Sequence, residues 1–234
     1  MKNIIALGVL ASTLFVTGCE FDNTVTGPVK NESISLDVNN AQRANVELDM
    51  AAGELNVRGG TEKLLQGRVE YNVPQWKPQV RDENNGQVAN VTVRQGEHGH
   101  GGGNRRNRWD VELNNNVLLD LDLSCGAGRA RLELGDLTLN KVNVHMGAGQ
   151  IDVDLEGNPT HSYSVNVQGG VGQATVRLPR NVGIRAQAHG GLGNIEVHGL
   201  TKHDNYYSNE QYGSSKVNVL VQIEGGIGQI RIIG

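Results

Sequence analysis

The 234-residue sequence is poor in cysteine and has no excess of basic residues. Only two cysteines are present, so a framework of several disulfides is excluded. Lys and Arg number 21 against 25 Asp and Glu, a net charge of −4, whereas nucleic-acid-binding proteins usually carry a basic stripe. The charge balance therefore argues against nucleic acid as a partner. Helical periodicity is missing after the first residues, and the alternation of apolar and polar residues predicts an all-β protein.

The N-terminal apolar run is too short to span a membrane as a helix. It follows Lys2 and ends in Val16-Thr17-Gly18-Cys19, which resembles the lipobox where bacterial lipoprotein precursors are cleaved and lipidated. The resemblance implies a signal peptide over residues 1–18, acyl chains such as palmitate on Cys19, and a tether over 19–32. Several acyl chains anchor a protein stably. We therefore expect a membrane-anchored lipoprotein of the cell envelope, in the outer membrane if the host has one, because Glu20 follows the cysteine. An ordinary secretory signal with an incidental cysteine is the alternative.

Glycine is abundant, with 32 residues, and recurs in pairs that mark an internal repeat. Two alternating segments flank each pair, so each copy predicts a strand, a corner and a second strand. The copies span residues 119–134, 142–155, 163–178, 184–197 and 217–232, with a weaker one at 46–57. The spacing between copies is 21 to 23 residues until the last interval, where the excess length predicts an inserted loop over 200–216.

The same positions of each copy carry apolar or side-chain-free residues, which indicates a shared inner face. One such column is Met50, Cys125, Met146, Gly169, Gly190 and Gly225. A single copy cannot bury its apolar face, whereas stacked copies share one core. We predict a repeat-built β-solenoid-like stack, with an antiparallel β-sandwich as the alternative. An outward amide ladder is expected from Gln150, Gln173, Asn194 and Gln229.

Residues 64–116 interrupt the repeat with less regular strand candidates at 65–73, 87–94 and 108–113. The expected organisation is an N-terminal β layer over 33–116, which caps one end of the stack, and a repeat domain over 117–234.

The glycine pairs do not read as ligand loops. A phosphate loop opens a helix and is usually followed by Lys, whereas each pair here leads into a strand. The calcium-binding nonapeptide needs a carboxylate where this chain has Ala174, Ile195 and Ile230. We therefore expect no cofactor and no metal at the corners.

Other chemistry-bearing residues predict no catalytic site. Cys125 lies on the inner face, where a buried inert thiol is expected. His145 and His189 share an outward column with one rung between them, a separation of about 10 Å, too far to share a metal. The outward acidic residues are mixed with basic ones, which does not favour a polysaccharide-active β-helix enzyme. Such an enzyme is the alternative function.

Two loops are the candidate contact sites for a partner. His98 and His100 lie in a glycine-rich stretch that reads as a hairpin tip. Tyr206, Tyr207 and Tyr212 lie in the late insert, and exposed tyrosines serve interfaces well. A flexible insert packed on the last rung is the alternative reading.

The sequence resembles the bacterial toast-rack family, related to the LiaF-like domain of cell-wall-active antibiotic response proteins. The resemblance rests on residues 46–55, 71–78 and 107–110, and on the Gly-Ala-Gly corners at 126–128 and 147–149. It implies an all-β envelope domain without established catalytic residues and, for the LiaF branch, a role in envelope-stress signalling. We therefore expect a non-enzymatic, lipid-anchored scaffold that binds an envelope protein or glycan, in the stress response or in adhesion.

Overall fold

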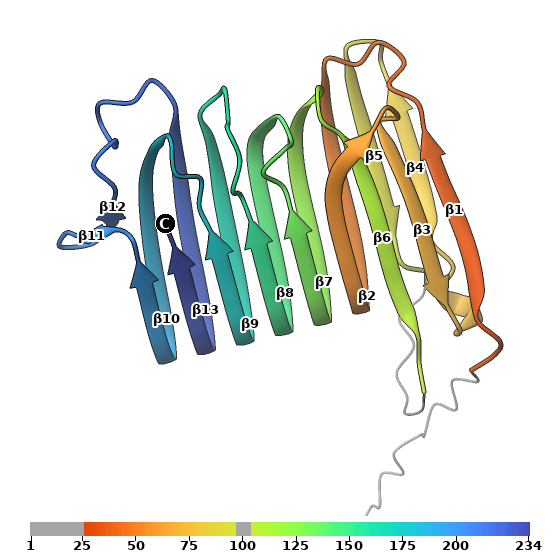
Figure 1. Cartoon of the computed structure of the whole chain (residues 1–234). Helices are drawn as coiled ribbons and strands as arrows, with labels where there is room; N and C mark the ends of the chain where they lie inside the picture. The colour runs from red at the N-terminus through yellow and green to blue at the C-terminus, as the bar shows by residue number, and fades with distance from the viewer. Residues whose placement is uncertain (1–25, 97–103) are drawn as a thin grey trace, which may run out of the picture.

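The computed structural model describes residues 26–96 and 104–234 and consists almost entirely of β-strands joined in one sheet (Figure 1). A single 3-10 turn, η1 (Pro74–Trp76), is the only helical element that the described residues form. In this part of the chain, no helix is long and apolar enough to cross a membrane. The N-terminal strands are β1 (Lys30–Leu36), β2 (Arg43–Thr61), β3 (Leu65–Tyr71), β4 (Gln79–Asn84), β5 (Val88–Arg94) and β6 (Asn107–Asn114). The remaining strands are β7 (Leu118–Glu133), β8 (Leu139–Asp154), β9 (Tyr163–Arg177), β10 (Gly183–His198), β11 (Thr201–Lys202), β12 (Tyr207–Ser208) and β13 (Asn218–Ile233).

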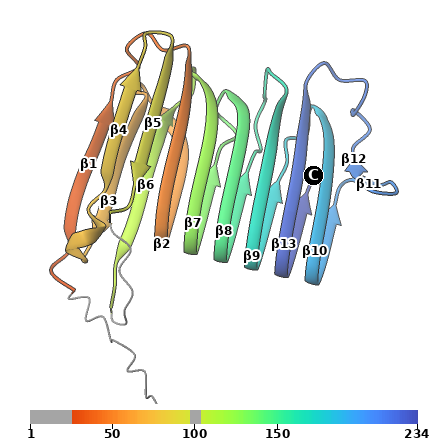
Figure 2. The same cartoon turned by 180° about the vertical axis from the view of Figure 1, so that it is seen from behind.

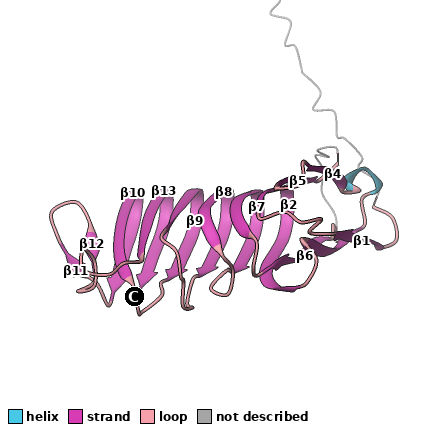
Figure 3. Ribbon diagram, turned by 90° about the horizontal axis from the view of Figure 1, so that it is seen from above, coloured by secondary structure: helices cyan, strands magenta, loops and turns pink. Residues whose placement is uncertain are grey.

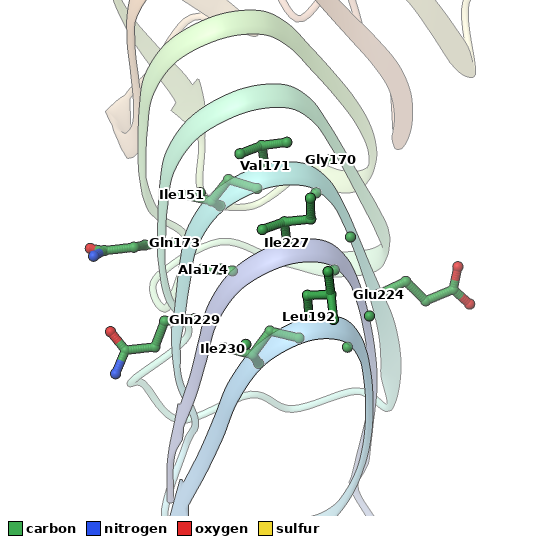
Figure 4. Close-up of a pocket in the computed structure, with 18 of the residues that line it drawn as sticks. Ile151, Gly170, Val171, Gln173, Ala174, Leu192, Glu224, Ile227, Gln229 and Ile230 are labelled. Carbon is green, nitrogen blue, oxygen red and sulfur yellow. The ribbon is translucent and has the colours of Figure 1, made fainter.

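Six long strands form the body of the molecule, and each bends at its corner into an arch with two legs (Figure 4). The corner is a glycine pair on five of them and Ala51-Ala52-Gly53 on β2. Neighbouring arches pair in parallel and in register along both legs, in the order β2-β7-β8-β9-β13-β10. Figure 2 shows the same row of long strands from behind, and Figure 3 shows from above that the legs form two layers. The predicted parallel, repeat-built stack is confirmed, and the antiparallel sandwich is not what the repeats form.

The inner faces of the two layers supply a continuous core. Each arch points alternate residues inward, as the alternating sequence predicts. On β8 these are Val142, Val144 and Met146 before the corner, and Ile151 and Val153 after it, all buried. The same columns on the neighbouring arches are mostly aliphatic, so the core runs through the stack as one cluster.

The second glycine of each pair makes the bend. Gly172 has a φ of +140°, a conformation that is essentially restricted to glycine. A Cβ atom at this position would also overlap the carbonyl oxygen of Gly149 on the neighbouring arch. The corner therefore requires glycine both for its own backbone and for the close approach of the next arch.

The two ends of the stack differ. At the N-terminal end, β6 continues one layer from β2 and is followed by β3 and β1, while β5 and β4 continue the other layer. At the opposite end, the insert contributes only β12, which pairs with β10, and β11, which pairs with β12. Strands β3, β5 and β6 correspond to the expected strand candidates, whereas β1 and β4 were not expected as strands.

The order of the arches differs from the order of the chain. The sequence led us to expect copies stacked in succession, but β13, the last strand, lies between β9 and β10. The connection from β9 to β10 skips one position, and the insert carries the chain back so that β13 fills the gap. Because all copies present similar apolar columns and pair in parallel, each can stack on any other.

Candidate functional site

The end of the stack formed by β10 and the insert is the candidate interaction site, and we call it the distal end. The chain enters the described structure at the other end, where the backbone N–H of Gly27 donates to the carbonyl of Asn72 and β1 begins at Lys30. One layer runs from β1 to β10 through nine strands. Eight spacings of about 4.8 Å place the distal end about 38 Å along the sheet from β1.

Two of the three tyrosines proposed from the sequence lie together at this end. The ring of Tyr206 stacks on His203 with centroids 4.5 Å apart and lies 6.5 Å from the ring of Tyr212. The guanidinium carbon of Arg185 lies 4.8 Å from the Tyr206 ring centroid, a cation–π contact between the insert and β10. Tyr207 instead lies in β12 and packs against the core.

The insert is tied to the stack by hydrogen bonds as well as by rings. Asn209 accepts from the backbone N–H of Ile184 at 2.8 Å and donates from Nδ2 to the carbonyl of Val182 at 2.7 Å. Its backbone N–H donates to the carbonyl of Ile184 at 3.3 Å. These bonds fix the half-buried Tyr206 and Tyr212 beside the last arch, which makes the insert an ordered wall of the distal end.

The distal end also exposes apolar side chains that the sequence analysis did not select. The residue just before the last corner glycine stands at the crest of its arch, and it is alanine on β2, β7 and β8. On the next three arches it is Val171, Ile227 and Leu192, which are 54%, 53% and 71% exposed. Figure 4 shows these three side chains in a row at the tops of their arches. The increase in size from alanine to leucine was visible in the repeat alignment and was the signal that could have revealed this apolar crest.

A small hollow lies under the last three arches. The inward positions just before the corner carry Met146 on β8 but Gly169, Gly225 and Gly190 on β9, β13 and β10. The missing side chains leave a cavity of about 60 Å³ lined mostly by apolar groups. Ile151 and Ile230 point into the arches from the opposite leg (Figure 4). On β10, Gly190 and the inward-facing Ile195, which is 36% exposed, meet solvent because no further arch covers this part of the strand.

The histidine pair considered from the sequence lies even farther apart than expected. We predicted one rung between His145 and His189, but both β9 and β13 lie between them. The register places Gln168 and then Glu224 in the same row. Among the residues that the structure describes, no group of three or more His, Cys, Asp and Glu side chains is arranged to hold a metal ion.

Cys125 lies in the core, as its column predicts, and is 3% exposed. Its Sγ atom contacts the carbonyl oxygen of Ala127 at 3.7 Å. Burial raises the pKa of the Cys125 thiol to about 11, so the thiolate that a nucleophile requires is scarce at neutral pH.

The outer face beyond the corner alternates acidic and basic side chains that pair with each other. Glu196 accepts from Arg231 Nε at 3.0 Å and from Gln229 Nε2 at 2.9 Å, and Asp110 pairs with Arg108 at 2.9 Å. The hydrogen bond from Arg231 is the main reason why the pKa of Glu196 lies below its ordinary value, so the carboxylate is charged at neutral pH. In the expected amide row, Gln150 likewise bonds to a carboxylate, that of Asp152. These pairs give the face a balanced charge pattern, not the acidic groove of a polysaccharide-active enzyme.

Three residues of the sequence-based proposals lie outside the described residues. These are Cys19, His98 and His100.

Comparisons with known proteins agree with the fold. The family model described as the N-terminal domain of toast_rack, DUF2154, matches residues 25–177. A crystal structure from Clostridium sporogenes, described as a "putative cell adhesion protein", is 35% identical with a TM-score of 0.84, over 87% of this chain and 98% of that one. A search of curated proteins finds no match.

Two more distant structures are each described as a "putative adhesin". The one from Bacteroides fragilis is 9% identical with a TM-score of 0.33, over 88% of this chain and 97% of that one. The one from Parabacteroides merdae is 11% identical with a TM-score of 0.27, over 90% and 99%.

Proposed function

Because the chain belongs to the toast-rack family, we propose that it is a non-enzymatic adhesion scaffold of the cell envelope, held to a membrane by acyl chains on Cys19. Adhesion is favoured over the stress-response role that the LiaF branch implies, because the 35% identical structure is described in terms of cell adhesion.

The difference between the two ends of the stack carries the proposal. The proposed tether would join the stack at the β1 end, where strands continue both layers. The apolar crest, the hollow and the tyrosines of the insert all gather at the opposite end, about 38 Å along the sheet. A stack anchored at the β1 end would hold the distal end away from the membrane, where an adhesive surface must lie.

The surface chemistry of the distal end suits a binding contact. Soluble proteins seldom expose large aliphatic side chains in a row, and such patches mark interaction sites. Leu192, Ile195 and Ile227 lie on two adjacent strands, and Tyr206 and Tyr212 lie on the insert beside them. An apolar centre next to tyrosine and arginine is the composition found in binding hot spots.

An enzymatic role is not favoured by the described residues. The buried thiol of Cys125 has a raised pKa, and the outer carboxylates are engaged by arginine and amide groups. A polysaccharide-active enzyme requires an acid and a base that converge on one substrate bond. Purified protein is therefore expected to leave cell-wall and capsular glycans intact, and their cleavage would favour the alternative.

The anchor is tested by cell fractionation. The wild-type protein should sediment with membranes, whereas Cys19→Ser should release it into the soluble fraction because the acyl chains are lost. A Cys125→Ser variant is the matched control and should remain in the membrane fraction. Unchanged sedimentation of the Cys19→Ser protein would contradict the lipid anchor.

The adhesive role is tested in whole cells that lack the gene. Wild-type protein should restore attachment to protein-coated and glycan-coated surfaces, whereas Leu192→Glu combined with Ile195→Glu should not. Thr175→Lys, on the outer face of β9, is the control and should restore attachment fully. Normal attachment of cells without the gene would refute the adhesive role.

A further inference from the structure

Part of β10 has an unpaired edge. Over the described ranges 26–96 and 104–234, the side of β10 that faces away from β13 pairs only with β12, at Arg185 and Ala186. Beyond these two residues, the strand continues through the corner to His198 with no sheet partner on that side. An unpaired edge presents backbone N–H and C=O groups in the spacing of a strand, and only another extended polypeptide satisfies them in a row.

The hollow under the arches opens at this same edge. Gly190 contributes no side chain, and its added Cβ would lie 3.4 Å from Cδ1 of Ile195, at ordinary contact distance. A cavity volume of about 10–15 Å³ is enough for one water molecule. The 60 Å³ cavity therefore has room for a short aliphatic side chain that enters from beyond β10.

The outward face of the edge carries one acidic side chain, Glu196, which is half-exposed. Arg231 pairs with its Oε2, and Gln229 and Asn194, two residues earlier on β10, donate to its Oε1. The opposite side of Glu196 faces the unpaired edge. A strand added there would place its own outward residue about 4.8 Å away, where a basic side chain would form the same contact as Arg231.

We propose that the distal edge of β10 binds an extended segment of a partner protein by strand addition, and that this segment has an aliphatic-basic-aliphatic pattern. The aliphatic residues cover Ile195 and the hollow, and the basic residue pairs with Glu196. The chain already uses this pattern on the other side of β10, where Ile230-Arg231-Ile232 lies beside Ile195-Glu196-Val197. The inference rests on the adhesive function proposed above and names the class of partner that the distal end takes.

A single strand fits this edge better than a second copy of the stack. Figures 1 and 3 show that β11, β12 and their connecting loop project beyond β10 along the stack. Two stacks joined end to end through β10 would press the insert of each copy against the end of the other stack, because both copies carry it at the joining end. A lone strand needs only the strip along the corner and the second leg, which the insert leaves open.

The test measures binding of a fluorescein-labelled peptide with the sequence of residues 227–234, IGQIRIIG, to the mature chain with Cys19→Ser. Fluorescence anisotropy should show saturable binding, and the peptide with Arg231→Glu should bind at least ten-fold more weakly. A scrambled peptide of the same composition is the second control. Equal binding of all three peptides, or binding of none, would overturn the proposal.

Variants of the protein locate the site. Gly190→Met should fill the hollow, as Met146 does on β8, and Ile195→Lys should place a charge on the inner face of the edge; each should weaken binding at least ten-fold. Glu196→Gln should weaken binding several-fold and abolish the preference for arginine over glutamate. Asn143→Lys, on the outer face of β8, should bind as the wild type does, and thermal melting of each variant shows whether the fold is kept. If Gly190→Met and Ile195→Lys melt as the wild type does yet bind the peptide normally, the edge is not the site.

The outcomes separate this proposal from the adhesive function. If cells attach only with an intact distal end and the purified protein does not bind the peptide, strand addition is refuted and the adhesive function is supported. Peptide binding with unaltered attachment of cells without the gene would refute adhesion and keep the strand site. Concentration-dependent dimers in sedimentation, lost in Ile195→Lys and without peptide binding, would show that a second copy covers the edge instead and would overturn the proposal.

Discussion

Replacing Gly169 by alanine should stabilise the protein, whereas the same change at Gly172, three residues later in the same corner, should strongly destabilise it. Gly169 points into the hollow, and a Cβ atom there would meet only the carbonyl oxygen of Glu224, at 4.0 Å. Its backbone needs no positive φ. The new methyl group therefore adds apolar burial without a clash.

The magnitude follows from two contributions. Alanine restricts the unfolded chain relative to glycine, which stabilises by about 0.4–1 kcal/mol at a compatible site. Burial of one methyl group adds about 0.8 kcal/mol. The free energy of unfolding should thus rise by about 1–2 kcal/mol, which corresponds to about 2–8 °C in the melting temperature for a protein of this size.

The change at Gly172 has the opposite sign for two reasons. Its φ of +140° is strained for any other residue by about 1–3 kcal/mol. The new Cβ would also overlap the backbone of Gly149, so two neighbouring arches would have to separate. We expect a loss of more than about 3 kcal/mol, a large part of the 5–15 kcal/mol that folded domains usually have.

Urea and thermal unfolding followed by far-ultraviolet circular dichroism measure both variants in the mature chain with Cys19→Ser. Gly169→Met extends the series, because Met146 fills the same position on β8. If Gly169→Ala loses stability as Gly172→Ala does, the inner face at this corner is already filled. If Gly172→Ala melts as the wild type does, the arches do not approach as closely as the structure indicates.

Other predictions follow from burial. Burial raises the pKa values of Cys125 and Tyr163, so these groups ionise in the unfolded chain before they ionise in the folded one as the pH rises. The free energy of unfolding should therefore fall above about pH 9. Cys125→Ala should make that decline smaller in urea titrations at pH 8 to 11. Cys125 should also resist thiol reagents in the native protein at pH 8 and react on unfolding, and fast native-state reaction would contradict its burial. Leu123→Ala should cost about 2–5 kcal/mol because the side chain is 1% exposed, whereas Leu192→Ala, 71% exposed, should change stability by less than about 0.5 kcal/mol in the same assay.

The sequence predicted the local structure of the repeat well, because the physical constraints on each copy are local. Alternation of apolar and polar residues identified the inner face, and the glycine pairs identified the corners. The column from Met50 to Gly225 faces inward as expected. The position of Tyr206 and Tyr212 in the late insert likewise predicted that they lie near each other.

The order of the arches could not be predicted in the same way. Each copy offers aliphatic columns and glycine corners that fit any other copy, so pairing energies hardly distinguish the neighbours. The connection from Arg177 to Gly183 can reach over one vacant position, because six residues span up to about 20 Å. The open edge and the hollow escaped prediction for this reason, since both depend on which copy stands last. The relation to LiaF-like domains, the domain boundary at 116 and the contacts of His98 and His100 stay predictions.

The position of β13 explains how an open edge can serve as a binding surface. A strand held at the end of a stack by one neighbour and one chain connection would fray, because segments with few contacts open easily. Here β13 pairs on both sides, with β9 and β10, over its whole length. The strand left at the end, β10, is held by chain connections at both of its ends and by β12 on part of its edge. The distal edge is therefore rigid without being closed, and a rigid unpaired strand loses little conformational entropy when a partner strand binds.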